Sequence, residues 1–160
     1  MKFIPEHWQK INTELVCFGA RDNQYGAFNI TKSGLLKTMK LVHKSGSIKC
    51  NSVDPVSYWG CTNAGYGTNG LMTIITNTER KVILPSTGEL KAKNGCNKKY
   101  FYTINGTNHT SPELAYHDLP NPLLLSRDQE LQIWYGQDWI DLSEDNNIGT
   151  TCVDVYAWYA

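Results

Sequence analysis

Residues 133–159, IWYGQDWIDLSEDNNIGTTCVDVYAWY, are two aromatic, β-prone segments joined by an acidic, amide-rich stretch. Residues alternate along both segments as they do in strands with one buried face. In 130–136 the alternation places Leu131 and Ile133 opposite Gln132 and Trp134. We therefore predict two paired strands joined by an acidic loop, each with a large aromatic side chain on its polar face. That side chain is either covered by the rest of the chain or exposed as a platform for a ligand.

The rest of the chain repeats the strand pattern. Short runs rich in β-branched and aromatic residues alternate with turn clusters such as NAGYGTNG (63–70) and NGTNHTSPE (105–113). The further predicted strands are 14–20, 24–31, 34–46, 71–76, 81–85, 99–104 and 122–126. Together they predict an all-β fold, an antiparallel β-sandwich or jelly roll. Within an N-terminal extension, 1–12, residues 5–12 favour a short helix with Pro5 in its first turn.

Length and charge narrow the class of protein. A chain of 160 residues suits a single domain spanning 1–160. Lys and Arg together number 15, and Asp and Glu together also number 15. The chain therefore lacks the net positive charge that attracts nucleic acid or an anionic membrane. No apolar run approaches the ~18 residues that cross a bilayer. We expect neither nucleic-acid binding nor membrane insertion.

The five cysteines favour disulfides. They are Cys17, Cys50, Cys61, Cys96 and Cys152, and they lack the close spacing of a zinc or redox site. Cys50 and Cys61 bracket a loop that contains proline and glycine, so we predict that they pair. An odd number leaves one thiol free or bridged to another chain, and buried reduced cysteines remain an alternative.

Cysteines and glycosylation motifs favour a secreted, extracellular protein. Three asparagines, Asn29, Asn105 and Asn108, begin N-x-Ser/Thr acceptor sequences. The opening MKFIPEHWQK lacks the apolar stretch of a secretory signal, which fits either a cytosolic chain or a mature form. Disulfides and acceptor sequences agree with the second.

The patterns of catalytic sites are weak. There is no GxSxG sequence, and the four histidines lie in unrelated contexts. The acidic stretch has enough carboxylates for the acid and nucleophile of a glycoside hydrolase, but nothing in the sequence sets one of them apart. We predict no catalysis and keep a small glycan-active hydrolase as the alternative.

The acidic stretch also offers the oxygen ligands that Ca²⁺ prefers. Residues 138–149, DWIDLSEDNNIG, do not have the spacing of an EF-hand, and a solvated loop is the alternative. The candidate calcium ligands are Asp141, Asp145 and Asn147.

The glycine-rich loop 63–70 lacks the pattern of a phosphate-binding loop and resembles a recognition loop instead. Together with 105–113 it could form one rim of a binding site. Amides and hydroxyls there would meet sugar hydroxyls, and Tyr66 would cover an apolar sugar face. The candidate ligand contacts are Tyr66, Asn69, Trp134 and Trp139.

Four stretches together resemble a domain of secreted cnidarian proteins. They are SIKCN (47–51), YWGCTN (58–63), IWYGQDW (133–139) and DNNIGTTCVDVYAWY (145–159). The size of the chain is similar to that of the cnidarins, small antiviral proteins. The resemblance implies an extracellular protein that binds a cell-surface or viral glycoprotein, or a glycan, and blocks viral entry. It also implies oxidised cysteines, and it carries no catalytic residues.

The sequence therefore predicts a secreted, disulfide-containing, lectin-like protein that binds carbohydrate or glycoprotein surfaces without turnover. Besides the hydrolase, an extracellular structural or adhesion module remains an alternative, in which exposed aromatic side chains would bind another protein.

Overall fold

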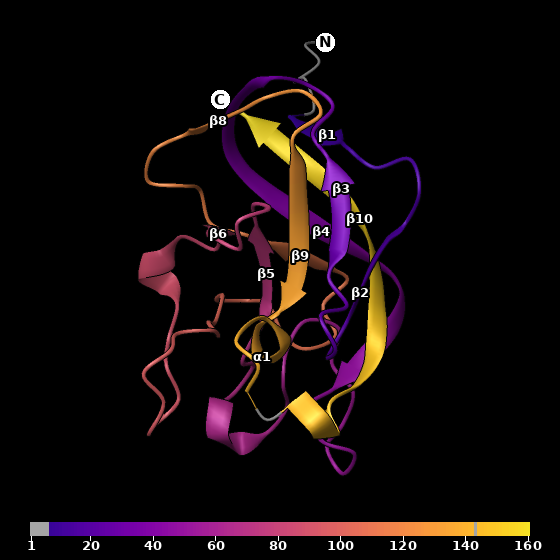
Figure 1. The fold of residues 1–160 in the computed structure, drawn as a ribbon, viewed down its shortest axis with the longest axis vertical. Helices are drawn as coiled ribbons and strands as arrows, with labels where there is room; N and C mark the ends of the chain where they lie inside the picture. Colours follow the sequence, from indigo (N-terminus) through magenta and orange to yellow (C-terminus); the bar gives the residue numbers. More distant parts are fainter. Residues whose placement is uncertain (1–6, 143) are drawn as a thin grey trace.

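Two antiparallel sheets form the molecule in the computed structural model, which describes residues 7–142 and 144–160. Sheet A contains β1 (Trp8–Lys10), β2 (Val16–Gly19), β4 (Gly34–Lys49), β7 (Glu113–Ala115), β8 (Leu123–Leu125) and β10 (Ile148–Tyr159). Sheet B contains β3 (Gly26–Asn29), β5 (Thr73–Thr76), β6 (Val82–Leu84) and β9 (Glu130–Tyr135), in the order β3-β9-β5-β6. In Figure 1 the strands of sheet B lie in front of the long pair β4 and β10. The predicted all-β antiparallel fold is confirmed.

The long pair β4–β10 is the centre of sheet A. The two strands run antiparallel from Ile148 opposite Lys49 to Tyr159 opposite Leu36, with β1 and β2 on the outer side of β10 and β7 and β8 on the outer side of β4. Alternate residues of β10, Val153, Val155 and Ala157, are completely buried, as their spacing predicts.

The hydrophobic core lies between the two sheets. Sheet A contributes Phe18, Leu36, Met39 and Leu41, and sheet B contributes Phe28, Ile75, Leu131 and Ile133. These side chains belong to one cluster of buried residues. Burying such a side chain stabilises the fold by about 1.5–3 kcal/mol.

Within residues 7–142 and 144–160, helical structure is limited to single turns. They are η1 (Ala64–Tyr66), η2 (Thr87–Glu89), α1 (Gly136–Trp139) and η3 (Glu144–Asn146). No helix in the described part of the chain has the length and apolar character needed to cross a membrane.

Two local predictions are wrong, and one further strand was not predicted. The expected helix at 5–12 is a strand over Trp8–Lys10, since Trp8 and Lys10 pair with β10; Pro5 lies outside the described residues. The expected strand 99–104 forms only isolated bridges to Leu71 and Lys91. The strand β7 was not predicted, because three residues are too few for an alternation to stand out.

The two aromatic segments of residues 133–159 do not pair with each other, contrary to the prediction. Strand β9 lies in sheet B between β3 and β5, and β10 lies in sheet A. The acidic stretch, with α1 and η3, therefore connects one sheet to the other. Alternation identifies the buried face of a strand, but it does not identify the neighbouring strand.

Candidate functional site

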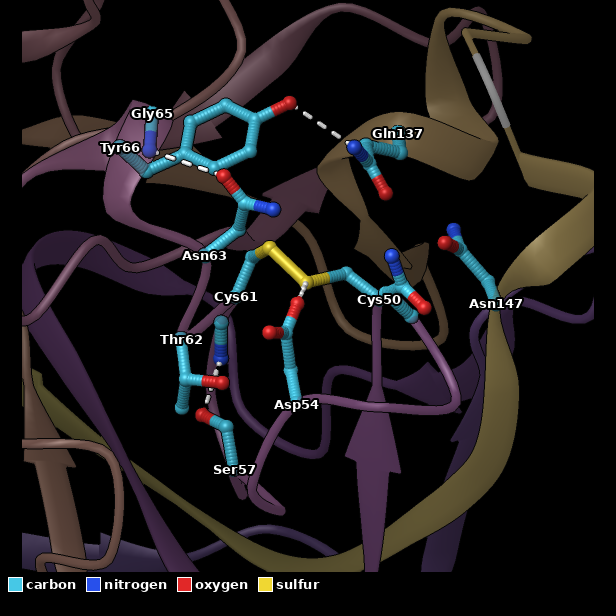
Figure 2. Close-up of a disulfide and its surroundings, with 12 residues drawn as sticks. Cys50, Asp54, Ser57, Cys61, Thr62, Asn63, Gly65, Tyr66, Gln137 and Asn147 are labelled. Carbon is cyan, nitrogen blue, oxygen red and sulfur yellow. Dashed lines mark hydrogen bonds between the residues drawn. A yellow bond between two sulfur atoms is a disulfide. The ribbon is translucent and has the colours of Figure 1, made fainter.

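The predicted Cys50–Cys61 disulfide is present. Cys50 directly follows β4, and Figure 2 shows Ser57 in the loop that leads back to Cys61. Ser57 Oγ fixes this loop, because it accepts hydrogen bonds from the backbone N–H groups of Trp59 (3.2 Å) and Gly60 (2.9 Å). Both cysteines are buried. A second disulfide, Cys17–Cys152, joins β2 to β10, and Cys96 keeps a free thiol.

A cavity of about 330 Å³ opens beside the Cys50–Cys61 disulfide. This volume lies at the lower end of the range of small-molecule sites. We call it the amide pocket, because five of the described residues that line it have a carboxamide side chain. The lining residues are Cys50, Asn51, Cys61, Asn63, Tyr66, Lys93, Asn94, Gly95, Cys96, Gln137, Leu142 and Asn146.

The wall of the amide pocket is held by a chain of hydrogen bonds. Gln137 Nε2 donates to Tyr66 Oη over 2.8 Å, and Tyr66 Oη lies 2.5 Å from Tyr100 Oη. Burial and the bond to Tyr66 raise the pKa of Tyr100, so its phenol stays protonated. Gln137 is placed by Gly136, where a Cβ would lie 2.3 Å from the Tyr100 carbonyl oxygen, so only glycine lets α1 begin there.

Two buried carboxamide oxygens near the disulfide lack a hydrogen-bond partner among the described residues. They are Gln137 Oε1 and Asn147 Oδ1, in side chains that are 5% and 0% exposed. Asn147 uses its amide nitrogen to donate to the Ala20 carbonyl over 2.9 Å. Figure 2 shows both carboxamides on the same side of the disulfide, with the Gln137 oxygen pointing into the space above Cys50.

An unpaired buried acceptor costs about 1–3 kcal/mol. A ligand that brings hydrogen-bond donors into this space would recover that free energy. The chemistry of the amide pocket therefore favours a ligand rich in hydroxyl or N–H groups.

The structure separates the predicted ligand contacts. Tyr66 lines the amide pocket but is only 5% exposed, so it forms a wall and does not cover a ligand as an open ring. Asn69 lies elsewhere, in a shallow hollow that it lines with Asn105 and Asn108.

The expectation that Trp134 forms an exposed platform is wrong. Its ring is 2% exposed and is covered by the Tyr25 ring, 4.8 Å away between centroids, and by the Arg80 guanidinium at 4.5 Å. Trp139 is partly exposed, but its indole N–H donates to the Arg80 carbonyl and the ring does not line the amide pocket.

Three carboxylates gather on the connection between the sheets. Ligand atoms of Asp138, Asp141 and Glu144 lie within 4.8 Å of one another. Asp138 is completely buried and accepts hydrogen bonds from the backbone N–H groups of Asn23 (2.9 Å) and Gln24 (3.1 Å). Burial raises the pKa of Asp138 despite these bonds. Burial and the nearby Asp138 carboxylate also raise the pKa of Glu144.

The predicted set of calcium ligands is not the set that the structure brings together. Asp141 lies in the carboxylate cluster, but Asp145 is exposed and lies outside it. Asn147 donates its amide N–H to the Ala20 carbonyl, its Oδ1 has no hydrogen-bond partner among the described residues, and its part in a cation site stays a prediction. The three clustered carboxylates suit a hard cation, but they supply only part of the six to eight oxygens that Ca²⁺ takes.

The same cluster is poorly placed for glycoside hydrolysis. Asp138 has no exposed surface, and both of its oxygens accept backbone hydrogen bonds. A general acid must reach the oxygen of the scissile bond. The geometry thus gives no support to the hydrolase alternative.

The three asparagines of the glycosylation sequences, Asn29, Asn105 and Asn108, are exposed. Their surroundings are compatible with an attached glycan, and glycosylation itself stays a prediction.

Sequence reasoning missed Gln137 and Lys93. Gln137 lies in the acidic stretch, whose carboxylates were the predicted functional groups. A glycine and an amide directly after a buried strand are nevertheless a signal for a positioned polar side chain. Lys93 lies in a polar loop, 93–96, that lines the pocket but is far in sequence from Asn51, Tyr66 and Gln137.

Fold and pocket together define a disulfide-linked, two-sheet β protein with a polar cavity beside the Cys50–Cys61 disulfide. No protein-family model matches the chain, and no curated protein matches it either. Among solved structures, AJLec, a lectin from the sea anemone Anthopleura japonica, matches with a TM-score of 0.87 and 34% identity over 96% of this chain and 97% of AJLec.

The chain therefore belongs to the family of AJLec. A sea-anemone relative agrees with the cnidarian resemblance of the sequence, although the relative found is a lectin and not a cnidarin.

Proposed function

We propose that this protein is a lectin: it binds glycans in the amide pocket without turning them over. The observation that carries the proposal is the match to AJLec, which spans nearly the whole of both chains. The amide pocket supports it, since sugars are recognised through many hydroxyl groups that both donate and accept hydrogen bonds.

The pocket has polar and apolar groups that complement those of a sugar, and its volume suits one sugar unit. Gln137 Oε1 would accept from a sugar hydroxyl, while the carboxamides of Asn51, Asn63 and Asn94 line the same space. Leu142 and the disulfide provide apolar surface for the C–H groups of a sugar ring. A cavity of about 330 Å³ has room for one sugar unit, with the rest of a glycan outside.

The natural partner in this proposal is a glycan on an extracellular glycoprotein. Two disulfides and three exposed glycosylation sequences support secretion. Binding to glycans on a cell or a virus would block contacts made by those glycans, so a role in antiviral defence is part of the proposal.

The carboxylate cluster adds a role for calcium to the proposal. The carboxylates of Asp138, Asp141 and Glu144 are in the same connection as Gln137, so a cation there would hold α1 and the pocket wall together. Removal of divalent cations with EDTA tests this directly.

A glycan array, run with and without EDTA, tests the proposal. We expect binding to a subset of glycans, and loss of binding in EDTA would show that a cation takes part. The best glycan is then titrated against Gln137→Leu, which keeps the side-chain volume and removes both polar atoms. Affinity should fall by at least about tenfold, the equivalent of one lost polar contact.

Gln9→Leu is the matched control, because Gln9 lies on the exposed face of β1, away from the pocket. It should bind as the original protein does. Failure of the protein to bind any glycan would overturn the proposed function. Normal binding by a folded Gln137→Leu variant would overturn the choice of pocket, and release of sugar from fluorogenic glycosides would favour the hydrolase.

A further inference from the structure

We infer that the amide pocket prefers glycans that carry an anionic group, a sulfate or a carboxylate, and that Lys93 recognises this group. The inference rests on the proposed function and adds a class of ligand to it.

Lys93 is an available cation at the pocket. It lines the cavity, and its Nζ lies 4.9 Å from the centroid of the Tyr66 ring. None of the ion pairs found in residues 7–142 and 144–160 involves Lys93. A cation–π contact leaves the outer side of an ammonium group able to donate hydrogen bonds to an anion.

Gly65 makes room for the Lys93 side chain. A Cβ at position 65 would lie 2.9 Å from Lys93 Cε and 3.0 Å from Nζ. The backbone there is fixed, since the Gly65 N–H donates to Asn63 Oδ1 over 2.8 Å (Figure 2). A larger residue at position 65 would therefore shift the ammonium group from its present place beside Tyr66.

Lys93 carries the one charge among the described residues that line the pocket, in a chain of zero net charge. Residues 91–99, KAKNGCNKK, contain four lysines and no acidic residue. None of the described residues that line the pocket is acidic. The nearest carboxylate on the disulfide, that of Asp54, lies 3.9 Å from Cys50 Sγ and does not line the cavity.

The pocket therefore contains two kinds of binding group, a hydrogen-bond acceptor and a cation. The unpaired oxygen of Gln137 needs a donor from the ligand, and the Lys93 ammonium needs an acceptor. A sugar that bears a sulfate or carboxylate as well as hydroxyl groups meets both needs. A charge-assisted hydrogen bond is stronger than a neutral one, which gives a preference of about 3- to 10-fold for the anionic ligand.

Calorimetric titration with a neutral glycan and with the sulfated or carboxylated form of the same glycan tests the inference. We expect the anionic form to bind about 3- to 10-fold more tightly. Lys93→Gln should abolish this preference, Gly65→Ala should weaken it, and Lys93→Arg should keep it. Lys81→Gln is the control, because Lys81 is 77% exposed and lies outside the pocket.

The outcomes distinguish the two proposals. Equal affinity for the neutral and anionic forms, or a preference that persists in Lys93→Gln, would overturn the inference and leave the lectin assignment intact. Absence of binding to either form, and to every glycan on the array, would remove the proposed function and the inference together.

Discussion

Removing the two disulfides one at a time separates the stability of the fold from the shape of the pocket. Cys17 and Cys152 are 135 residues apart in sequence, so their bond closes most of the chain into a loop. The chain-entropy model gives about 5 kcal/mol for a loop of this length. Cys50 and Cys61 are 11 residues apart, which corresponds to about 3 kcal/mol.

For glycan binding, the surroundings of the two disulfides predict the opposite order: removal of Cys50–Cys61 should weaken binding more than removal of Cys17–Cys152. Cys17 is exposed on β2, so replacing Cys17 and Cys152 by alanine removes few contacts of the folded state. Cys50 and Cys61 are buried and line the amide pocket. Replacing them leaves a gap in its wall and frees the loop that leads to Asn63.

We therefore expect the Cys17→Ala/Cys152→Ala variant to melt about 10–20 °C lower and to bind glycan normally at 25 °C. The Cys50→Ala/Cys61→Ala variant should melt only about 6–11 °C lower but lose at least about tenfold in affinity. Melting is followed by circular dichroism and affinity by calorimetric titration. Normal binding by the second variant, or a smaller loss of stability in the first, would refute the reasoning.

Three further measurements test other parts of the structure. Burial raises the pKa values of Asp138 and Glu144, so the folded chain holds these protons more tightly than the unfolded chain. The resulting stabilisation is complete below pH ~4 and is lost as the pH rises through the folded pKa; urea denaturation should therefore show a flatter pH profile for Glu144→Gln than for the unmodified chain. Trp134→Ala should cost about 3–5 kcal/mol in urea denaturation, because the ring is buried. Cys96→Ser should remove any disulfide-linked dimer from non-reducing gels and leave the melting temperature unchanged, since Cys96 has the free thiol.

The sequence predicts faces of strands better than it predicts neighbours. Alternation correctly assigned the buried residues of β10, because that strand has one face against the core. It left open whether Trp134 is covered or exposed; both faces of β9 are covered, and Gln132 on the same face is also buried. Whether a second layer covers a strand depends on residues far away in sequence, here Tyr25 and Arg80.

Distance along the chain also limits what can be predicted of the site. The Cys50–Cys61 pair was predictable because a short loop brings the two residues together, whereas the partner of Cys17 lies 135 residues away. Gln137 and Lys93 reach the same cavity from separate segments, which only the tertiary structure shows.

The carboxylate cluster is a further arrangement that was not predicted from the sequence. Asp138, Asp141 and Glu144 are three residues apart, which is the spacing of helical turns, and α1 and η3 occupy this stretch. The prediction of a hairpin loop instead placed Asp145 and Asn147 among the candidate calcium ligands.

A crystal structure of the protein with the best glycan from the array tests the central claim most directly. We expect electron density for a sugar beside the Cys50–Cys61 disulfide, with a hydroxyl group within hydrogen-bond distance of Gln137 Oε1. A sugar bound elsewhere, such as in the hollow beside Asn69 or on the outer face of sheet A, with the amide pocket empty, would contradict it.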